Sequence, residues 1–204
     1  MTRAEQLTGG PLPEGRGAAW TEERGTSDER RRRHRGRLAA GGQTTLFAYG
    51  TLQFAEVLRV LLDRVPGRGP GAVAGWRAAA LAGRVYPGLV RADGEVTGIL
   101  LTGLTPAELR VIDEYESGPY ELELLTLKDG RDGWAYAWTD QAEVLAHDWS
   151  PGEFADLHLA DFAEKCRAWR DGYEAGGRTG RGIRRPHDPG PDPGEPSRLA
   201  APPL

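Results

Sequence analysis

The sequence predicts an α+β domain, in which a small mixed, mostly antiparallel β-barrel has flanking helices. Three observations lead to this prediction. Strand-like segments outnumber helical ones, and strands adjacent in the sequence look antiparallel. A tight "DGRDG" turn joins two of them in a hairpin pattern. The 204 residues are enough for one such domain and not comfortably for two.

Both ends of the chain differ in composition from its middle. Many of the 29 glycines and 15 prolines lie near the ends, with charged side chains and few large apolar ones. Such segments bury too little apolar surface to offset the entropy lost on ordering. We therefore expect a disordered Arg-rich tail at 1–43, a domain at 44–175 and a disordered Gly/Pro-rich tail at 176–204.

The first part of the domain is predicted to alternate strand, helix and strand. The apolar run "TTLFAY" predicts a buried strand. "QFAEVLRVLLDRV" predicts a helix, because its apolar residues recur at three- and four-residue spacing, and "PGRGPG" ends it. The flanking glycines of "AVAGWRAAALAG" favour a bent strand over a helix. "GRVYPGLVRADG" predicts a loop around Pro87, and "EVTGILLTGL" a further strand.

A helix start signal opens the second part. Thr105 is a good N-cap, Pro106 suits the first helical position, and Glu108 completes a capping box. Ser117-Gly118, followed by a proline, ends this helix. "YELELLTLK" and "GWAYAWT" are the strands of the predicted hairpin, and residues 148–173 have a helical pattern.

Glu116 is the most informative residue of the helix that follows Thr105. Successive residues turn by about 100°, which places Glu116 on the inner face that Leu109 and Ile112 define, whereas Glu114 points away and Asp113 lies on the border. A carboxylate there is costly to bury, and the helix dipole disfavours an anion in the last turn. We therefore expect a raised pKa, suited to acid–base chemistry. The alternative is a frayed turn in which the glutamate reaches water.

The strand end in "FAYGTL" is a second candidate feature. Gly50 has no side chain, so a ligand can approach its backbone closely. The amides of Thr51 and Leu52 would begin the next helix and point outward. A helix start of this kind binds carboxylates or stabilises an oxyanion. The alternative is a plain tight turn.

These motifs resemble the γ-glutamylcyclotransferase-like family, which includes γ-glutamylamine cyclotransferases and plant avirulence-induced relatives. The resemblance covers about Leu46 to Trp149. It rests on "FAYGTL", "VYPGLV", "GILLTGLTPAELRVIDEYESGPYELELLTL", and "AYAW" followed by "HDW". It implies a small mixed β-barrel with Glu116 as the catalytic acid/base. The residues it implies for holding the substrate are Tyr49, Gly50, Thr51 and Leu52.

The resemblance also implies a reaction. The α-amino group of a γ-glutamyl unit attacks its own side-chain amide, which releases 5-oxoproline and a free amine, without a metal or a cofactor. A non-catalytic small-molecule binding module of the same fold is the alternative. Two departures leave the loop shape and the substrate open. Ser117 follows the glutamate where the family often has glycine, and His147-Asp148-Trp149 stands for Gly-Asp-Trp.

Other residues give weaker signals. Tyr120 either lines the pocket or packs in the core, and Tyr86 either faces substrate or lies on the surface. Cys166 is expected to be a packed thiol rather than a nucleophile. The four histidines lack the spacing of a metal site, so no metal is expected.

The charge pattern limits the expected partners. The net charge of -4 gives no global basic field, although the "RRRRHRGR" run at Arg30–Arg37 is a possible contact for nucleic acid. We favour a solvated tail there and expect no nucleic-acid partner. No stretch approaches the ~20 apolar residues of a membrane span. With no signal-peptide pattern, this predicts a cytoplasmic protein. The oligomeric state and the released amine stay open.

Overall fold

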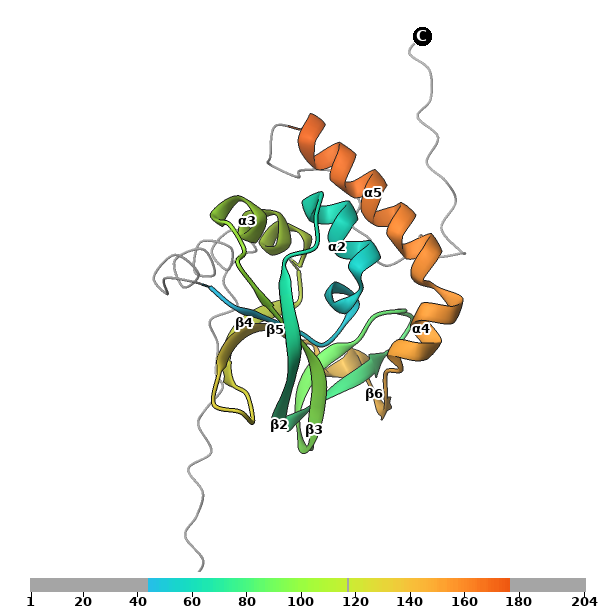
Figure 1. Ribbon diagram of the computed structural model, residues 1–204. Coiled ribbons are helices and arrows are strands. Elements are labelled where there is room, and N and C mark those ends of the chain that lie inside the picture. Colours follow the sequence, from blue (N-terminus) through green and yellow to red (C-terminus); the bar gives the residue numbers. More distant parts are fainter. Residues whose placement is uncertain (1–43, 117, 177–204) are drawn as a thin grey trace, which may run out of the picture.

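The computed structural model describes residues 44–116 and 118–176 (Figure 1). The tails predicted for 1–43 and beyond 176, with the Arg30–Arg37 run, lie outside the described residues and stay predictions. The described elements are β1 (Leu46–Ala48), η1 (Thr51–Gln53), α2 (Ala55–Leu62), β2 (Gly67–Leu81), β3 (Gly88–Thr102), α3 (Pro106–Tyr115), β4 (Tyr120–Thr126), β5 (Asp132–Trp138), η2 (Gln141–Glu143), β6 (Val144–Asp148), α4 (Pro151–Leu157) and α5 (Leu159–Ala175). Helices α2, α3 and α5 lie together on one side of the strands.

The six strands of the described region form one sheet that curls on itself. Their order is β4-β5-β1-β3-β2-β6, with a further pairing between β5 and β3. β1 pairs antiparallel with the end of β3, at Leu46 and Leu101, and parallel with β5, at Leu46 and Trp134. The start of β3 pairs directly with β5 in parallel, at Leu89 and Ala137. The two ends of β3 therefore run in opposite senses relative to β5, so β3 bends. The prediction of a small mixed barrel with flanking helices is confirmed.

The bend lies in the long hairpin of β2 and β3. Their register shifts between Ala74 and Trp76, which is the mark of a bulge. Gly75, between them, has a φ of 81°, a conformation that residues with a side chain rarely adopt. A bulge increases local twist and bends the strand. The bent strand predicted for "AVAGWRAAALAG" is therefore confirmed.

Several local predictions were wrong. The loop predicted for "GRVYPGLVRADG" is confined to Ala82–Pro87, because its second half pairs with β2 inside β3. Helix α2 ends at Leu62, before "PGRGPG", and most of that segment belongs to β2, which begins at Gly67. Pro70 is tolerated there because β6 pairs with β2 only near Ala79 and Leu81, so the other edge is open. The sheet ladder thus outweighs the local glycine and proline signals.

The helix predicted for 148–173 was also too simple. Asp148 ends strand β6, and the helical region is divided into α4 and α5 at His158. Ser150 caps α4 by accepting a hydrogen bond from the amide of Glu153, at 3.2 Å. Cys166 of α5 is fully buried in the core with Phe162 and Trp169, as a packed thiol should be.

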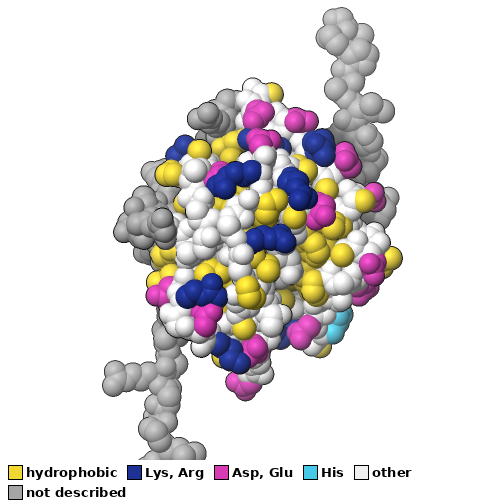
Figure 2. Space-filling model, in the orientation of Figure 1, with side chains coloured by type: hydrophobic (Ala, Val, Ile, Leu, Met, Phe, Trp, Pro, Cys, Tyr) yellow, Lys and Arg dark blue, Asp and Glu magenta, His cyan; other side chains and the backbone are white. Residues whose placement is uncertain are grey.

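Acidic and basic side chains are interspersed on the face shown in Figure 2. The ion pairs of the described residues include those of Arg64 with Glu108, Arg131 with Asp129, and Lys128 with Glu95. Within the described ranges, no helix is both long and apolar enough to cross a membrane.

Candidate active site

Helix α3 delivers Glu116 to the interior. Its start is fixed by the predicted capping box: Glu108 N donates to Thr105 Oγ1 at 3.2 Å, and Thr105 N donates to Glu108 Oε2 at 2.7 Å. The helix ends at Tyr115, and Glu116 is its C-cap, with its amide donating to Ile112 O at 2.8 Å. Both ends of α3 are thus set by hydrogen bonds, which fix where the Glu116 side chain leaves the backbone.

Glu116 is buried, as its place on the helix predicted. Its side chain is 7% exposed, beside an inner face where Ile112 is fully buried. Burial raises the pKa of Glu116 to about 8, because a carboxylate loses its hydration in the interior. The frayed-turn alternative is therefore wrong. A carboxyl group with this pKa changes its protonation state near neutral pH, as an acid/base requires.

Two neighbouring acids are buried, although the helical wheel placed neither of them on the inner face. Glu114, expected to point away, is buried, and Asp113, expected on the border, is 2% exposed. Every residue of α3 from Val111 to Glu116 is buried, so structure surrounds this end of the helix on all sides. A one-face model does not apply to such a helix end. Tyr136 Oη donates to Asp113 Oδ1 at 3.4 Å.

Glu116 borders a small cavity at the end of β1. The cavity has a volume of about 20 Å³, close to the minimum that holds one water molecule. Its lining consists of Leu46, Phe47, Ala48, Tyr49, Gly50, Thr51, Leu52, Tyr86, Pro87, Glu116, Tyr120 and Tyr136. The structure therefore brings together all six residues that the sequence proposed for the site. Their roles in catalysis and substrate binding stay predictions.

The turn after β1 supplies the backbone wall of the cavity. Gln53 N donates to Gly50 O at 3.1 Å, and Phe54 N donates to Thr51 O at 3.2 Å. Thr51 and Leu52 come directly before Gln53 and Phe54, so their amides lie at the start of the turn. Gly50 has a negative φ, so its backbone angle does not demand glycine. Space is tight, however: a Cβ atom there would lie 3.0 Å from Cγ of Pro87, so the proline ring would have to shift.

Two tyrosine hydroxyls brace the walls. Tyr49 Oη donates to Tyr136 O at 2.7 Å and accepts from Leu89 N at 3.1 Å, so it ties β1 to β5 and β3. Tyr120 Oη donates to Pro87 O at 3.1 Å, while its ring packs edge-on against Trp138. Tyr120 thus combines the two possibilities that the sequence left open, because it lines the cavity and packs in the core.

The loop Ala82–Pro87 covers the cavity and is held by polar contacts. Arg84 makes a two-pronged ion pair with Glu143, both contacts at 2.6 Å, and donates to Tyr86 Oη at 2.5 Å. Trp149 Nε1 donates to Val85 O at 2.8 Å. Tyr86 is buried, which raises the pKa of its hydroxyl to about 12, so the surface alternative is wrong.

Sequence reasoning missed Pro87 and Tyr136 as lining residues. Alternation in "AYAW" places Tyr136 on one face with Trp134 and Trp138. The face of β5 that carries Tyr136 becomes a cavity wall only because the sheet curls. Across 44–116 and 118–176, no group of three His, Cys, Asp or Glu residues is placed to hold a metal ion.

Comparison with known families decides the family. Residues 46–152 match the model of "Gamma-glutamyl cyclotransferase, AIG2-like", and this match covers more than half of the chain. The chain belongs to this family. The resemblance drawn from the sequence motifs is confirmed, and the matched region contains every residue that lines the cavity of this family member.

Relatives of this AIG2-like chain come from Arabidopsis thaliana. AIG2-like protein D is 30% identical over 135 residues, which are 62% of this chain and 89% of that protein. AIG2-like protein C is 34% identical over 124 residues, 57% of this chain and 72% of that protein. A solution structure from the same plant shares 26% identity with a TM-score of 0.48, and covers 67% of this chain and 86% of its own.

Proposed function

We propose that this family member is a γ-glutamylcyclotransferase that converts a γ-glutamyl amide into 5-oxoproline and a free amine. One observation carries the proposal. Glu116, a buried carboxyl group with a pKa near 8, lines the same cavity as the Gly50–Leu52 turn. Membership of the family supports the reaction class. A group able to accept and return a proton, next to backbone that can bind an anion, suffices for this chemistry.

Glu116 acts as the base and then as the acid. The α-amino nitrogen forms a bond to the side-chain amide carbon, and the bond from that carbon to the departing nitrogen breaks. The attack starts from the neutral amine. As its nitrogen bonds to the carbonyl carbon it loses one proton to Glu116, and Glu116 returns that proton to the departing nitrogen, so the transfer balances without water. A pKa of about 8 lets Glu116 accept and return a proton near neutral pH.

The turn holds the substrate, and the cavity widens to admit it. The amides of Thr51 and Leu52 bind the α-carboxylate or the developing oxyanion. A cavity with room for about one water is too small for a γ-glutamyl group. The walls of the cavity therefore move apart when substrate binds.

A panel of γ-glutamyl compounds tests this function. γ-Glutamyl amino acids, γ-glutamyl-lysine side-chain amides and γ-glutamyl polyamines are incubated with the protein, and 5-oxoproline is measured. Release from at least one class, with loss of release in Glu116→Gln, is the expected result. Binding without release from any compound would instead favour a non-catalytic small-molecule binding module.

A further inference from the structure

The helix that leads to Glu116 also contacts the turn that lines the same cavity. Tyr115 immediately precedes Glu116, and about 100° of helical rotation separates their side chains. Glu116 borders the cavity, whereas the Tyr115 hydroxyl lies 3.3 Å from Thr51 Oγ1, at hydrogen-bond range. Thr51 is the first residue of η1 and lines the same cavity. Two consecutive residues of α3 thus reach the cavity and its backbone wall.

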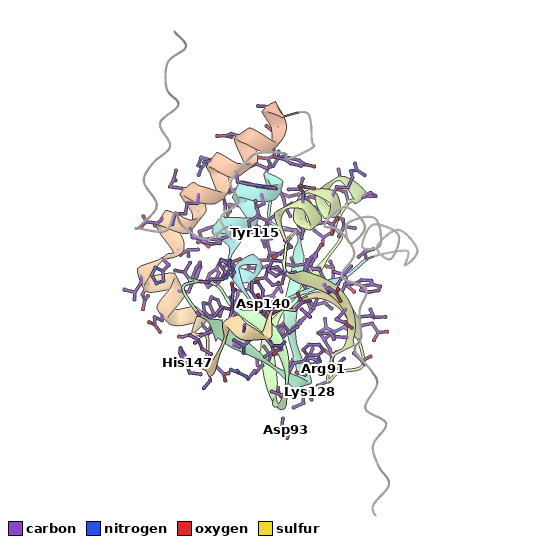
Figure 3. All side chains as sticks on the ribbon, turned by 180° about the vertical axis from the view of Figure 1, so that it is seen from behind. Arg91, Asp93, Tyr115, Lys128, Asp140 and His147 are labelled. Carbon is purple, nitrogen blue, oxygen red and sulfur yellow. The ribbon has the colours of Figure 1, made fainter. Side chains whose placement is uncertain are left out.

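The surroundings of Tyr115 hold its ring in one place. Tyr115 is fully buried and lies among the helices α2, α3 and α5 (Figure 3). Its ring packs edge-on against Trp169 of α5, with centroids 5.6 Å apart. Its hydroxyl also lies 3.7 Å from Cys166 Sγ. The hydroxyl therefore occupies a point where α3, α5 and η1 meet, and the ring has little freedom to leave it.

We propose that Tyr115 is a positioning residue, whose hydroxyl ties Thr51 to α3 and so fixes the spacing between Glu116 and the Gly50–Leu52 turn. This inference rests on the proposed cyclotransferase function. Intramolecular attack requires the reacting amine, the base and the backbone donors to hold one geometry, and a misplacement of about 1 Å is costly. Hydrophobic packing alone resists sliding weakly, whereas a hydroxyl pair has a defined direction and length.

The Thr51 side chain has a role here beyond its amide. Threonine and serine both supply the hydroxyl that Tyr115 contacts, whereas valine has the same shape without it. Removing either hydroxyl leaves the other side chain in place and breaks the connection, and removing that of Tyr115 also breaks its contact with Cys166 Sγ. If the connection is what matters, the loss of both hydroxyls costs no more than the loss of one.

The test uses the best γ-glutamyl compound of the panel. It compares the turnover and thermal midpoint of the full chain with those of Tyr115→Phe, Thr51→Val, Thr51→Ser and the double variant Tyr115→Phe/Thr51→Val. Tyr115→Phe and Thr51→Val should each lower kcat by about 3- to 10-fold, the range for one lost neutral hydrogen bond. The double variant should match the single ones, and Thr51→Ser should retain more kcat than Thr51→Val.

Tyr173→Phe is the matched control, because Tyr173 is buried, stacks on the same Trp169 and does not line the cavity. The kcat of Tyr173→Phe should equal that of the wild type.

The outcomes separate two failures. If the wild-type protein releases 5-oxoproline and Tyr115→Phe has an unchanged kcat, Tyr115 is a packing residue and the inference is overturned alone. Additive losses in the double variant would overturn it as well. If the wild-type protein turns over no γ-glutamyl compound, the proposed function falls, and the inference with it. Should Tyr115→Phe unfold at the assay temperature, Thr51→Val decides from the other side of the bond.

Discussion

Replacing Glu116 with glutamine should change how folding stability depends on pH. The pKa of Glu116 is about 8 in the folded protein, against an ordinary value of 4.5. Between these two values the folded chain keeps a proton that the unfolded chain has lost. Stability therefore falls as pH rises through this window, and the loss is complete above about pH 8. Glutamine cannot ionise and resembles the protonated carboxyl group, so it removes this slope.

The structure sets the size of the effect. The window from 4.5 to about 8, at about 1.4 kcal/mol for each pH unit, amounts to about 5 kcal/mol as an upper estimate. Glu116→Gln should have the stability of the wild type near pH 4.5 and exceed it by several kcal/mol at pH 9. Urea unfolding at intervals between these pH values measures the difference, in which contributions of the other titrating groups cancel. Glu164→Gln, at an exposed position of α5, serves as the control.

Parallel stability curves for the wild type and Glu116→Gln would refute this reasoning. They would show that the carboxyl group titrates equally in the folded and unfolded chains and is therefore not desolvated in solution. The acid/base role would then lose its physical basis, because an ordinary glutamate is a weak base for an ammonium near neutral pH.

Three further results are expected. The value of kcat/KM should rise with pH up to about 8, tenfold for each unit at low pH, since Glu116 must be ionised to accept a proton; a profile flat from pH 5 to 8 would contradict this. Gly50→Val should abolish calorimetric binding of a γ-glutamyl ligand, because a Cβ atom would press on Pro87 and fill the cavity; full affinity in the folded variant would make the turn a mere connection. Trimming the chain to about residues 42–176 should leave the thermal midpoint unchanged, because the removed segments have few large apolar side chains; a fall of many degrees would show that the domain is larger.

The sequence sufficed for the features that depend on short-range signals. The capping box at Thr105 and the seven-residue step from Leu109 to Glu116 both act within one helix, and both are confirmed. Glu114 shows the limit of such reasoning. A helical wheel assumes one buried face, and the end of α3 is enclosed on all sides, which no spacing within the helix reveals.

The rest depended on pairing between distant segments. Some residues of β2 and β3 have the glycines and prolines of a loop. They are strands because the two segments form backbone hydrogen bonds with each other. The cavity itself exists because β3 bends, so that its start pairs with β5 and its end with β1, which brings Tyr136 and Pro87 to the end of β1. The contact of Tyr115 with Thr51 spans 64 residues and likewise has no local signal.

The most direct test of the account is the turnover of Glu116→Gln beside that of the wild type and of Glu114→Gln. The two glutamates are buried on the same helix, and only Glu116 lines the cavity. Release of 5-oxoproline from the best substrate should fall by at least ~100-fold in Glu116→Gln, the scale of a lost general acid/base. Glu114→Gln should keep the kcat of the wild type, whatever its thermal midpoint. Near-normal turnover by a folded Glu116→Gln protein would contradict the account, since the proton would then move without the carboxylate.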